Sequence, residues 1–265
     1  MQIFRYKADI IPALVIIALS IADFTVFFTA KNQLLVAIWA FVGIWPKACI
    51  CSWNHHHQHV PTFLHTPLNR FMDLIYAFHT GITTNTWVLN HVLGHHVNYL
   101  DQEKDESAWM RKDGTKMGTI EYTLSIALTG YTRAFKVGKK HPKFQKTFLS
   151  MGFLTAALLI GMFFINWYNA LLIFALPMLI GYIITCWHTY YHHAGLETDD
   201  HLEASYNTIH KSYNILTGNL GYHTAHHSKQ ALHWSKLPEY HEKIKDGIPQ
   251  HLYRKPCFPF TLMPA

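Results

Sequence analysis

Histidines grouped in four short clusters are the residues of this sequence that could do chemistry. The chain contains 21 histidines, almost as many as its 22 lysines and arginines together. The clusters occupy residues 53–59, 90–96, 187–195 and 221–227. A single run of histidines is often no more than a solvated surface. Four runs in one chain predict a metal site, because neutral imidazole is the commonest metal ligand in proteins.

The spacing within the clusters supports a metal site. In three clusters the histidines lie three or four residues apart: His55 and His59, then His91, His95 and His96, then His223, His226 and His227. On a helix these intervals place side chains on one face, with Cβ atoms about 5–6 Å apart. Two imidazoles placed in this way can share one metal or hold neighbouring metals.

The number of histidines bears on which metal binds. One tetrahedral zinc needs four ligands, or three and a water. Eight or more histidines are available here, which is enough for two metals with positions left open. Imidazole binds iron, zinc, copper and nickel, so the ligand type alone does not decide.

The elements that must position these histidines are long apolar helices. Half of the residues are hydrophobic and 14% are charged, against about 25% charged in a typical soluble domain. Segments at about 10–30, 33–53, 147–165 and 168–187 approach or reach the length of about 20 residues that a membrane-spanning helix needs. The sequence therefore predicts an all-α integral membrane protein, with four transmembrane helices in two hairpins.

The charges predict which side of the membrane holds the clusters. The two hairpin turns, at Lys31-Asn32 and Asn166-Trp167, must lie on the same side, and Lys31 is then the one basic residue there. Since basic residues favour the cytoplasmic side, the termini and large loops are predicted to be cytoplasmic. The chain is expected to form a single domain, 1–265, in which residues 54–146 and 188–265 make a helical cap that holds the metal site. Iron suits a site beside hydrocarbon, where a lipid-like substrate could be oxidised.

Two other stretches are expected to lie along the membrane without crossing it. Residues 71–90 include Asp73 and His79 and are too polar for a comfortable span, and residues 120–131 have apolar positions at helical spacing. Asp23, inside the first span, is either functional or a hydrogen-bonded aspartate near the far interface.

The positive net charge of +6 has two interpretations. No nucleic-acid-binding motif is present, and the basic residues flank apolar runs. One basic group could dock an acidic electron carrier or bind anionic lipid; it consists of Arg133, Lys136, Lys139, Lys140, Lys143 and Lys146. The four cysteines have neither disulfide nor zinc-site spacing.

The clusters resemble the histidine boxes of the membrane fatty acid desaturase superfamily, which includes alkane hydroxylases and carotenoid ketolases. The family pattern is HxxxH or HxxxxH, then HxxHH or HxxxHH, then (H/Q)xxHH, around two transmembrane hairpins. The first box is matched by residues 55–59, the second by residues 91–96 and the third by residues 223–227. The resemblance extends from about residue 10 to residue 245.

The resemblance also implies further ligands and some departures. In the alkane hydroxylases another histidine precedes the last box, and His193 in T-Y-Y-H-H-A-G matches it, with His188 and His192 in reserve. The first box often has an acid after its leading histidine, where this chain has His56, so His56 or His57 could replace His55. Asn219, four residues before the third box, either holds a water near the metals or belongs to a turn.

What the resemblance implies for function is an O2-dependent oxidoreductase with two iron ions (Fe2+/Fe3+) and a lipid acyl substrate. Fatty-acyl desaturation is favoured over hydroxylation of a fatty acid or alkane. Beyond the metal ligands no catalytic residue is expected. Electrons would come from an external donor of ferredoxin, rubredoxin or cytochrome b5 type with its reductase, because no flavin, haem or iron–sulfur motif is visible in the sequence.

Two other expectations follow. The compact chain without a fused donor domain favours a bacterial inner membrane over the endoplasmic reticulum. The alternatives to this enzyme are a metal transporter or metal sensor, and a zinc-dependent membrane hydrolase. A transporter would have polar ligands inside its spans, whereas here the histidines lie beyond the ends of the apolar segments.

Overall fold

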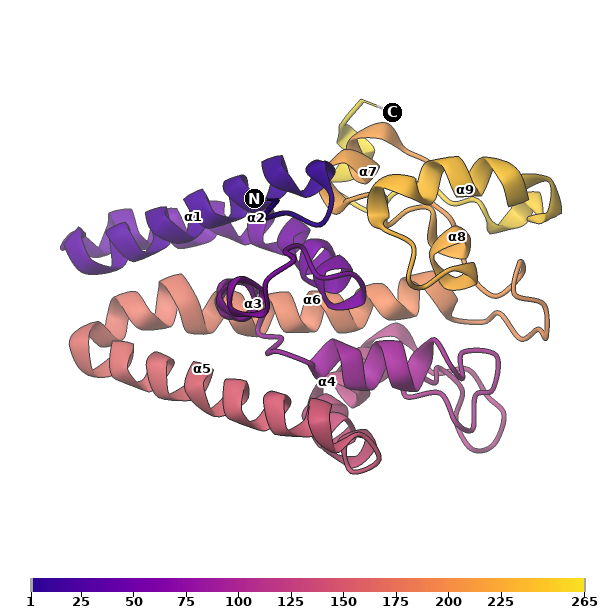
Figure 1. Ribbon diagram of the computed structural model, residues 1–265, viewed down its shortest axis with the longest axis horizontal. Helices are drawn as coiled ribbons and strands as arrows, with labels where there is room; N and C mark the ends of the chain where they lie inside the picture. Colours follow the sequence, from indigo (N-terminus) through magenta and orange to yellow (C-terminus); the bar gives the residue numbers. More distant parts are fainter. Residues whose placement is uncertain (1, 265) are drawn as a thin grey trace. The chain divides into compact units, whose positions relative to one another are not determined.

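The regular secondary structure of the protein is helical. The computed structural model describes residues 2–264, in which β-structure is confined to three isolated bridges (Figure 1). The chain forms two compact units. Unit 1 comprises Met1–Trp87 and Gly138–Thr185, and unit 2 comprises Val88–Val137 and Cys186–Ala265.

The first two helices of unit 1 form a hairpin. Helix α1 (Ile10–Thr29) and helix α2 (Gln33–His59) begin where the apolar segments were predicted to begin. Asn32 starts α2, because its side-chain oxygen accepts hydrogen bonds from the backbone N–H groups of Leu34 and Leu35 at 3.0 and 3.2 Å. Helix α2 continues beyond the predicted end of the span at residue 53, so the first histidine cluster lies on the helix itself.

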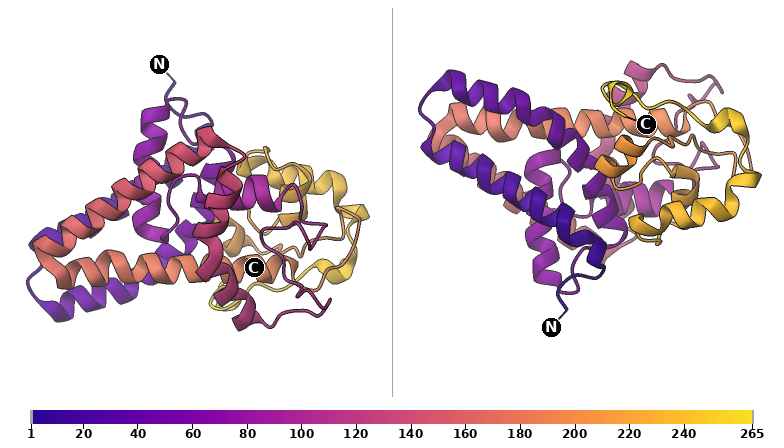
Figure 2. Two further views of the ribbon diagram at one scale, coloured as in Figure 1. Left: turned by 90° about the horizontal axis from the view of Figure 1, so that it is seen from below. Right: turned by 90° about the horizontal axis from the view of Figure 1, so that it is seen from above.

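A second long helical stretch comprises helix α5 (Pro142–Asn169), the π-helix η3 (Ala170–Ala175) and helix α6 (Leu176–His193). Its 52 residues would extend about 78 Å as one straight helix, against about 30 Å of hydrocarbon. At the predicted turn, Asn166 leaves the helical conformation (φ −153°, ψ 94°), and the chain reverses between α5 and α6 (Figures 1 and 2).

Three helical stretches of the described residues are long and apolar enough to cross a membrane: Lys7–Thr29, Gln33–His59 and Pro142–His193. The third contains both segments that were predicted as separate spans. Helix α3 (Thr66–Thr80) is not among the three. The polar stretch at 71–90 thus becomes the end of α3, a turn that starts at Gly81 (φ 67°), and the beginning of the π-helix η2 (Val88–His95).

Asp23 is buried in unit 1 and paired. Lys47 Nζ lies 2.9 Å from Asp23 Oδ2, and Trp39 Nε1 donates a hydrogen bond to Asp23 Oδ1 at 2.8 Å. Lys47 also donates to the backbone oxygen of Ile173 in the π-helix η3, at 2.8 Å. The two charges therefore compensate one another in the apolar interior, as the hydrogen-bonded alternative for Asp23 requires.

Unit 2 contains one long helix and three short ones, joined by long loops. They are α4 (Thr119–Gly138), α7 (Lys211–Thr217), α8 (His223–Ser228) and α9 (Leu237–Ile244). Trp109, Tyr122 and Ala194 are buried together and bring α4 against the chain that follows α6. This framework positions three of the four histidine clusters.

Candidate metal centre

The second histidine cluster lies on a π-helix. In η2 the backbone N–H of His96 donates to the oxygen of His91, five residues earlier, at 2.8 Å. The wider turn brings residues that are four and five positions apart onto one side of the helix. The ring centroid of His91 therefore lies 5.1 Å from that of His95 and 4.5 Å from that of His96. The sequence predicted ordinary helical spacing. π-helical turns are rare and are found frequently at functional sites.

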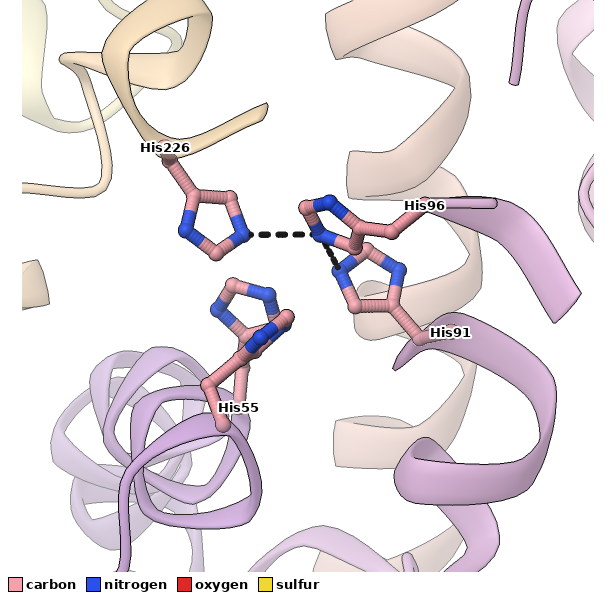
Figure 3. A group of neighbouring side chains, drawn as sticks. His55, His91, His96 and His226 are labelled. Carbon is pink, nitrogen blue, oxygen red and sulfur yellow. Dashed lines mark hydrogen bonds between the residues drawn. The ribbon is translucent and has the colours of Figure 1, made fainter. Parts of the chain in front are cut away.

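Three imidazoles of unit 2 form a first group. The Nε2 atom of His96 lies 3.0 Å from Nε2 of His91 and 3.0 Å from Nε2 of His226. Figure 3 shows these three rings pointing toward one another, His226 from α8 and the other two from the second cluster. All three side chains are buried.

Four imidazoles form a second group in the same unit. Nε2 of His193 lies 3.3 Å from Nε2 of His95 and 3.0 Å from Nε2 of His223. His227 stands beside them, with its ring centroid 4.5 Å from that of His193. Burial, followed by the neighbouring rings of His96 and His193, lowers the pKa of His227 well below the usual range for histidine. The ring is therefore neutral at pH 7, as a metal ligand must be.

Both groups fit metal ions better than they fit hydrogen bonds. A neutral imidazole nitrogen either donates or accepts, yet Nε2 of His96 and Nε2 of His193 each face two other ring nitrogens. Metal–nitrogen bonds of about 2.1 Å at angles of 90–109° place two ligand nitrogens about 3.0–3.4 Å apart. The observed separations of 3.0–3.3 Å lie in that range.

Two of these rings are oriented by a contact at Nδ1, the ring nitrogen that does not face the other histidines. His95 Nδ1 lies 2.8 Å from Asp105 Oδ1, which also accepts from the backbone N–H of Ser107 at 2.8 Å. His193 Nδ1 donates to the backbone oxygen of Ala204 at 2.9 Å. Such contacts place the proton on Nδ1 and leave the Nε2 lone pair for a metal.

The fourth histidine cluster, residues 221–227, is held by a polar network that the spacing of the histidines does not predict. Asn207 Oδ1 accepts from the backbone N–H of Thr224 at 3.0 Å, and Asn207 Nδ2 donates to Thr224 Oγ1 at 2.7 Å. Ser205 Oγ lies 2.9 Å from the same hydroxyl. All three side chains are buried, so the short helix α8 is anchored at its second residue.

Comparison with known protein families identifies the family of this chain. The model of the fatty acid desaturase family matches residues 32–258. The chain belongs to the fatty acid desaturase family. No protein of curated function and no solved structure gives a significant match. Family membership and the apolar helices indicate a membrane protein with desaturase-like chemistry.

The first histidine box of this desaturase-family chain lies in unit 1. His55 and His59 are on α2 with ring centroids 4.7 Å apart, the distance that four-residue spacing on a helix predicts. His56 lies beside His55, at 5.1 Å between centroids. His57 contacts other residues with both ring nitrogens: Nδ1 lies 2.8 Å from Thr62 Oγ1, and Nε2 lies 3.4 Å from Asp73 Oδ1.

His192, one of the two reserve histidines, lies beside the second group, and His188 lies beside His192. His192 stacks on His223 at 3.8 Å between centroids, and its Nε2 lies 3.2 Å from Nδ1 of His188. Asn219 has a positive φ of 63°, and its side-chain amide donates to the backbone oxygen of Trp234 at 3.2 Å. That geometry is typical of a turn residue, the ordinary alternative for Asn219.

Proposed function

We propose that this protein is an O2-dependent di-iron fatty-acyl desaturase that introduces a double bond into a lipid acyl chain. The observation that carries the proposal is the convergence of seven buried imidazoles of unit 2 into two groups with metal-like nitrogen separations. Two groups suit a pair of metals. Membership in the desaturase family favours iron over the other metals that imidazole binds.

The proposed ligand set has nine histidines. His91, His96 and His226 would hold one iron, and His95, His193, His223 and His227 the other. By the family pattern, His55 and His59 would complete the set from the first box. His56, His57, His188, His192 and Asn219 are not needed by this assignment.

The protein's part in the reaction is to hold the metals, to orient their ligands and to shield the site from water. Bound iron would supply the activation of O2 and the oxidising power to remove hydrogen from an unactivated C–H bond. Asp105 and the carbonyl of Ala204 keep His95 and His193 in one tautomer and orientation. The histidines serve as ligands and not as acids or bases. Their burial keeps bulk water away from a reactive centre.

Electrons would come from a separate carrier with a reductase.

We further propose four membrane crossings, with α5 and α6 each contributing one, and cytoplasmic termini. The reversal at Asn166 and the positive-inside pattern support this topology. A bacterial inner membrane remains the favoured location.

Lipid analysis tests the reaction. The chain is expressed with a donor and reductase in a host whose lipids are then profiled by mass spectrometry. Desaturation predicts acyl chains that have lost two hydrogens. Chains that gain one oxygen would instead establish the second candidate, a fatty acid or alkane hydroxylase, which the match of His193 to the alkane hydroxylase pattern favours. A His96→Ala variant gives the matched negative control.

Metal analysis of the purified protein tests the cofactor. The proposal predicts about two irons per chain, bound through deprotonated ring nitrogens. About one zinc per chain, with no change in host lipids, would instead indicate a zinc-dependent hydrolase. Reversible metal binding that supports metal uptake into vesicles would indicate a transporter.

A further inference from the structure

Helix α4 has three distinct faces. At about 100° of rotation per residue, Tyr122, Ile126, Gly130 and Ala134 share one side, and this side is buried or half-buried in unit 2. A second side is exposed and polar; it consists of Glu121, Ser125, Thr129, Thr132 and Lys136. An ordinary amphipathic helix of a soluble domain would need no more than these two sides.

The third face is apolar and exposed. Ile120 is 77% exposed, Leu124 49% and Leu128 81%, and all three lie on the same side of α4 because they are four residues apart. Phe135, 41% exposed, continues the stripe toward the end of the helix. Large aliphatic side chains aligned on a surface mark a site that contacts something apolar.

The shape of the stripe favours lipid over a protein partner. A standard protein interface covers about 800 Å² on each partner and 20–30 residues, whereas this stripe is one side chain wide. It would extend about 22 Å along the helix from residue 120 to residue 135. An apolar line beside a polar face is the pattern of a helix that lies in the plane of a membrane surface.

The charges at the end of α4 define the kind of lipid. Lys136 is exposed on the last turn, and Lys139 and Lys140 follow the helix directly and are exposed as well. Basic residues beside an apolar stripe attract anionic headgroups, at about 1 kcal/mol for each lysine near the surface. The exposed part of the stripe itself contains no acidic residue.

The buried side of α4 is bonded to the second histidine cluster. Asn90 Nδ2 donates to the backbone oxygen of Gly130 at 2.7 Å. Tyr122 donates its hydroxyl to the backbone oxygen of Ser107 at 3.1 Å, two residues after Asp105. A helix held by lipid on one side therefore supports, on its other side, the segment that orients His91 and His95.

We infer that α4 is an in-plane lipid-binding helix for anionic membranes, which steadies the second histidine cluster at the membrane surface. The inference rests on exposure, side-chain chemistry and these hydrogen bonds. It does not depend on which reaction the metal centre performs, so the two proposals can fail separately.

Site-directed labelling of the full chain in vesicles tests the inference. Cys257 is changed to serine, since Cys49, Cys51 and Cys186 are buried. A fluorophore is then attached at Leu128→Cys or, as the matched control on the polar face of the same helix, at Thr132→Cys. Metal content is measured for both variants to show that unit 2 is intact.

The expected result is that a quencher attached to lipid tails quenches the label at 128, whereas aqueous iodide quenches the label at 132. Quenching at 128 should increase with the fraction of anionic lipid, and this increase should be lost in the Lys136→Gln/Lys140→Gln variant. Iodide quenching of both labels would overturn the inference. So would a label at 128 that is shielded only after an acidic carrier protein is added, because α4 would then be a docking site. Equal quenching with anionic and zwitterionic lipids would overturn the headgroup preference.

Discussion

Replacing Asp105 with asparagine should weaken metal binding without unfolding unit 2. The carboxylate lies 2.8 Å from His95 Nδ1 and 2.8 Å from the backbone nitrogen of Ser107, and both side chains of the His95–Asp105 pair are 1% exposed. Asparagine has nearly the same shape, and its oxygen can still accept both hydrogen bonds. What it removes is the negative charge that makes the His95 ring a stronger donor to a metal.

The expected loss of metal affinity can be taken from other carboxylates that accept a hydrogen bond from a metal-bound histidine. Loss of such a partner typically costs 10–100-fold in metal affinity, or about 1.4–2.8 kcal/mol. Asp105→Ala should cost more, because two buried donors lose their acceptor at about 1–3 kcal/mol each. The order of metal affinity is therefore wild type, then Asp105→Asn, then Asp105→Ala.

The assay is competition for Fe2+ between the detergent-solubilised protein and a chelator of known affinity, under anaerobic conditions. Asp101→Asn is the matched control, because Asp101 lies on the same loop but its side chain is 40% exposed and pairs with Lys104. Its iron affinity should equal that of the wild type. Wild-type affinity in Asp105→Asn would refute the reasoning, since the Asp105 carboxylate would then have no influence on the metal.

Three further predictions concern the histidines, the metal and the buried ion pair. The His96→Ala variant should lose about one of its two metals, because His96 Nε2 lies between the Nε2 atoms of His91 and His226. Elemental analysis measures the metal content. The control variant His251→Ala, changed at an exposed position, should bind metal normally. Removing the metal with a chelator should lower the unfolding temperature, since a ligand at 100 times its Kd stabilises by about 2.7 kcal/mol; an unchanged melting curve would mean that no metal stabilises the fold. Lys47→Met should destabilise unit 1 by about 3–5 kcal/mol, because it leaves buried Asp23 uncompensated; unfolding in detergent checks this, and Asp23→Asn/Lys47→Met should regain most of the loss.

The sequence by itself determined the helical class, the apolar segments and the candidate ligands. Long apolar runs fold as helices in a membrane because each backbone polar group must be satisfied within its own segment. The beginnings of α1 and α2 and the turn at Asn166 were therefore predictable from local composition. The spacing of the histidines was equally visible, and the family resemblance it supports is confirmed.

Only the tertiary structure decided how each ring is used. His57 lies in the same run as His55, yet Thr62 and Asp73 engage it, and no spacing rule separates the two. The π-helical turn of the second cluster, the choice of Asp105 behind His95 and the anchoring of Thr224 by Asn207 all depend on contacts between distant residues. The third face of α4 is of the same kind, because composition marks its apolar residues but packing determines which of them stay exposed. Local sequence fixes what a side chain can bind, whereas the partners brought beside it by folding fix what it does bind.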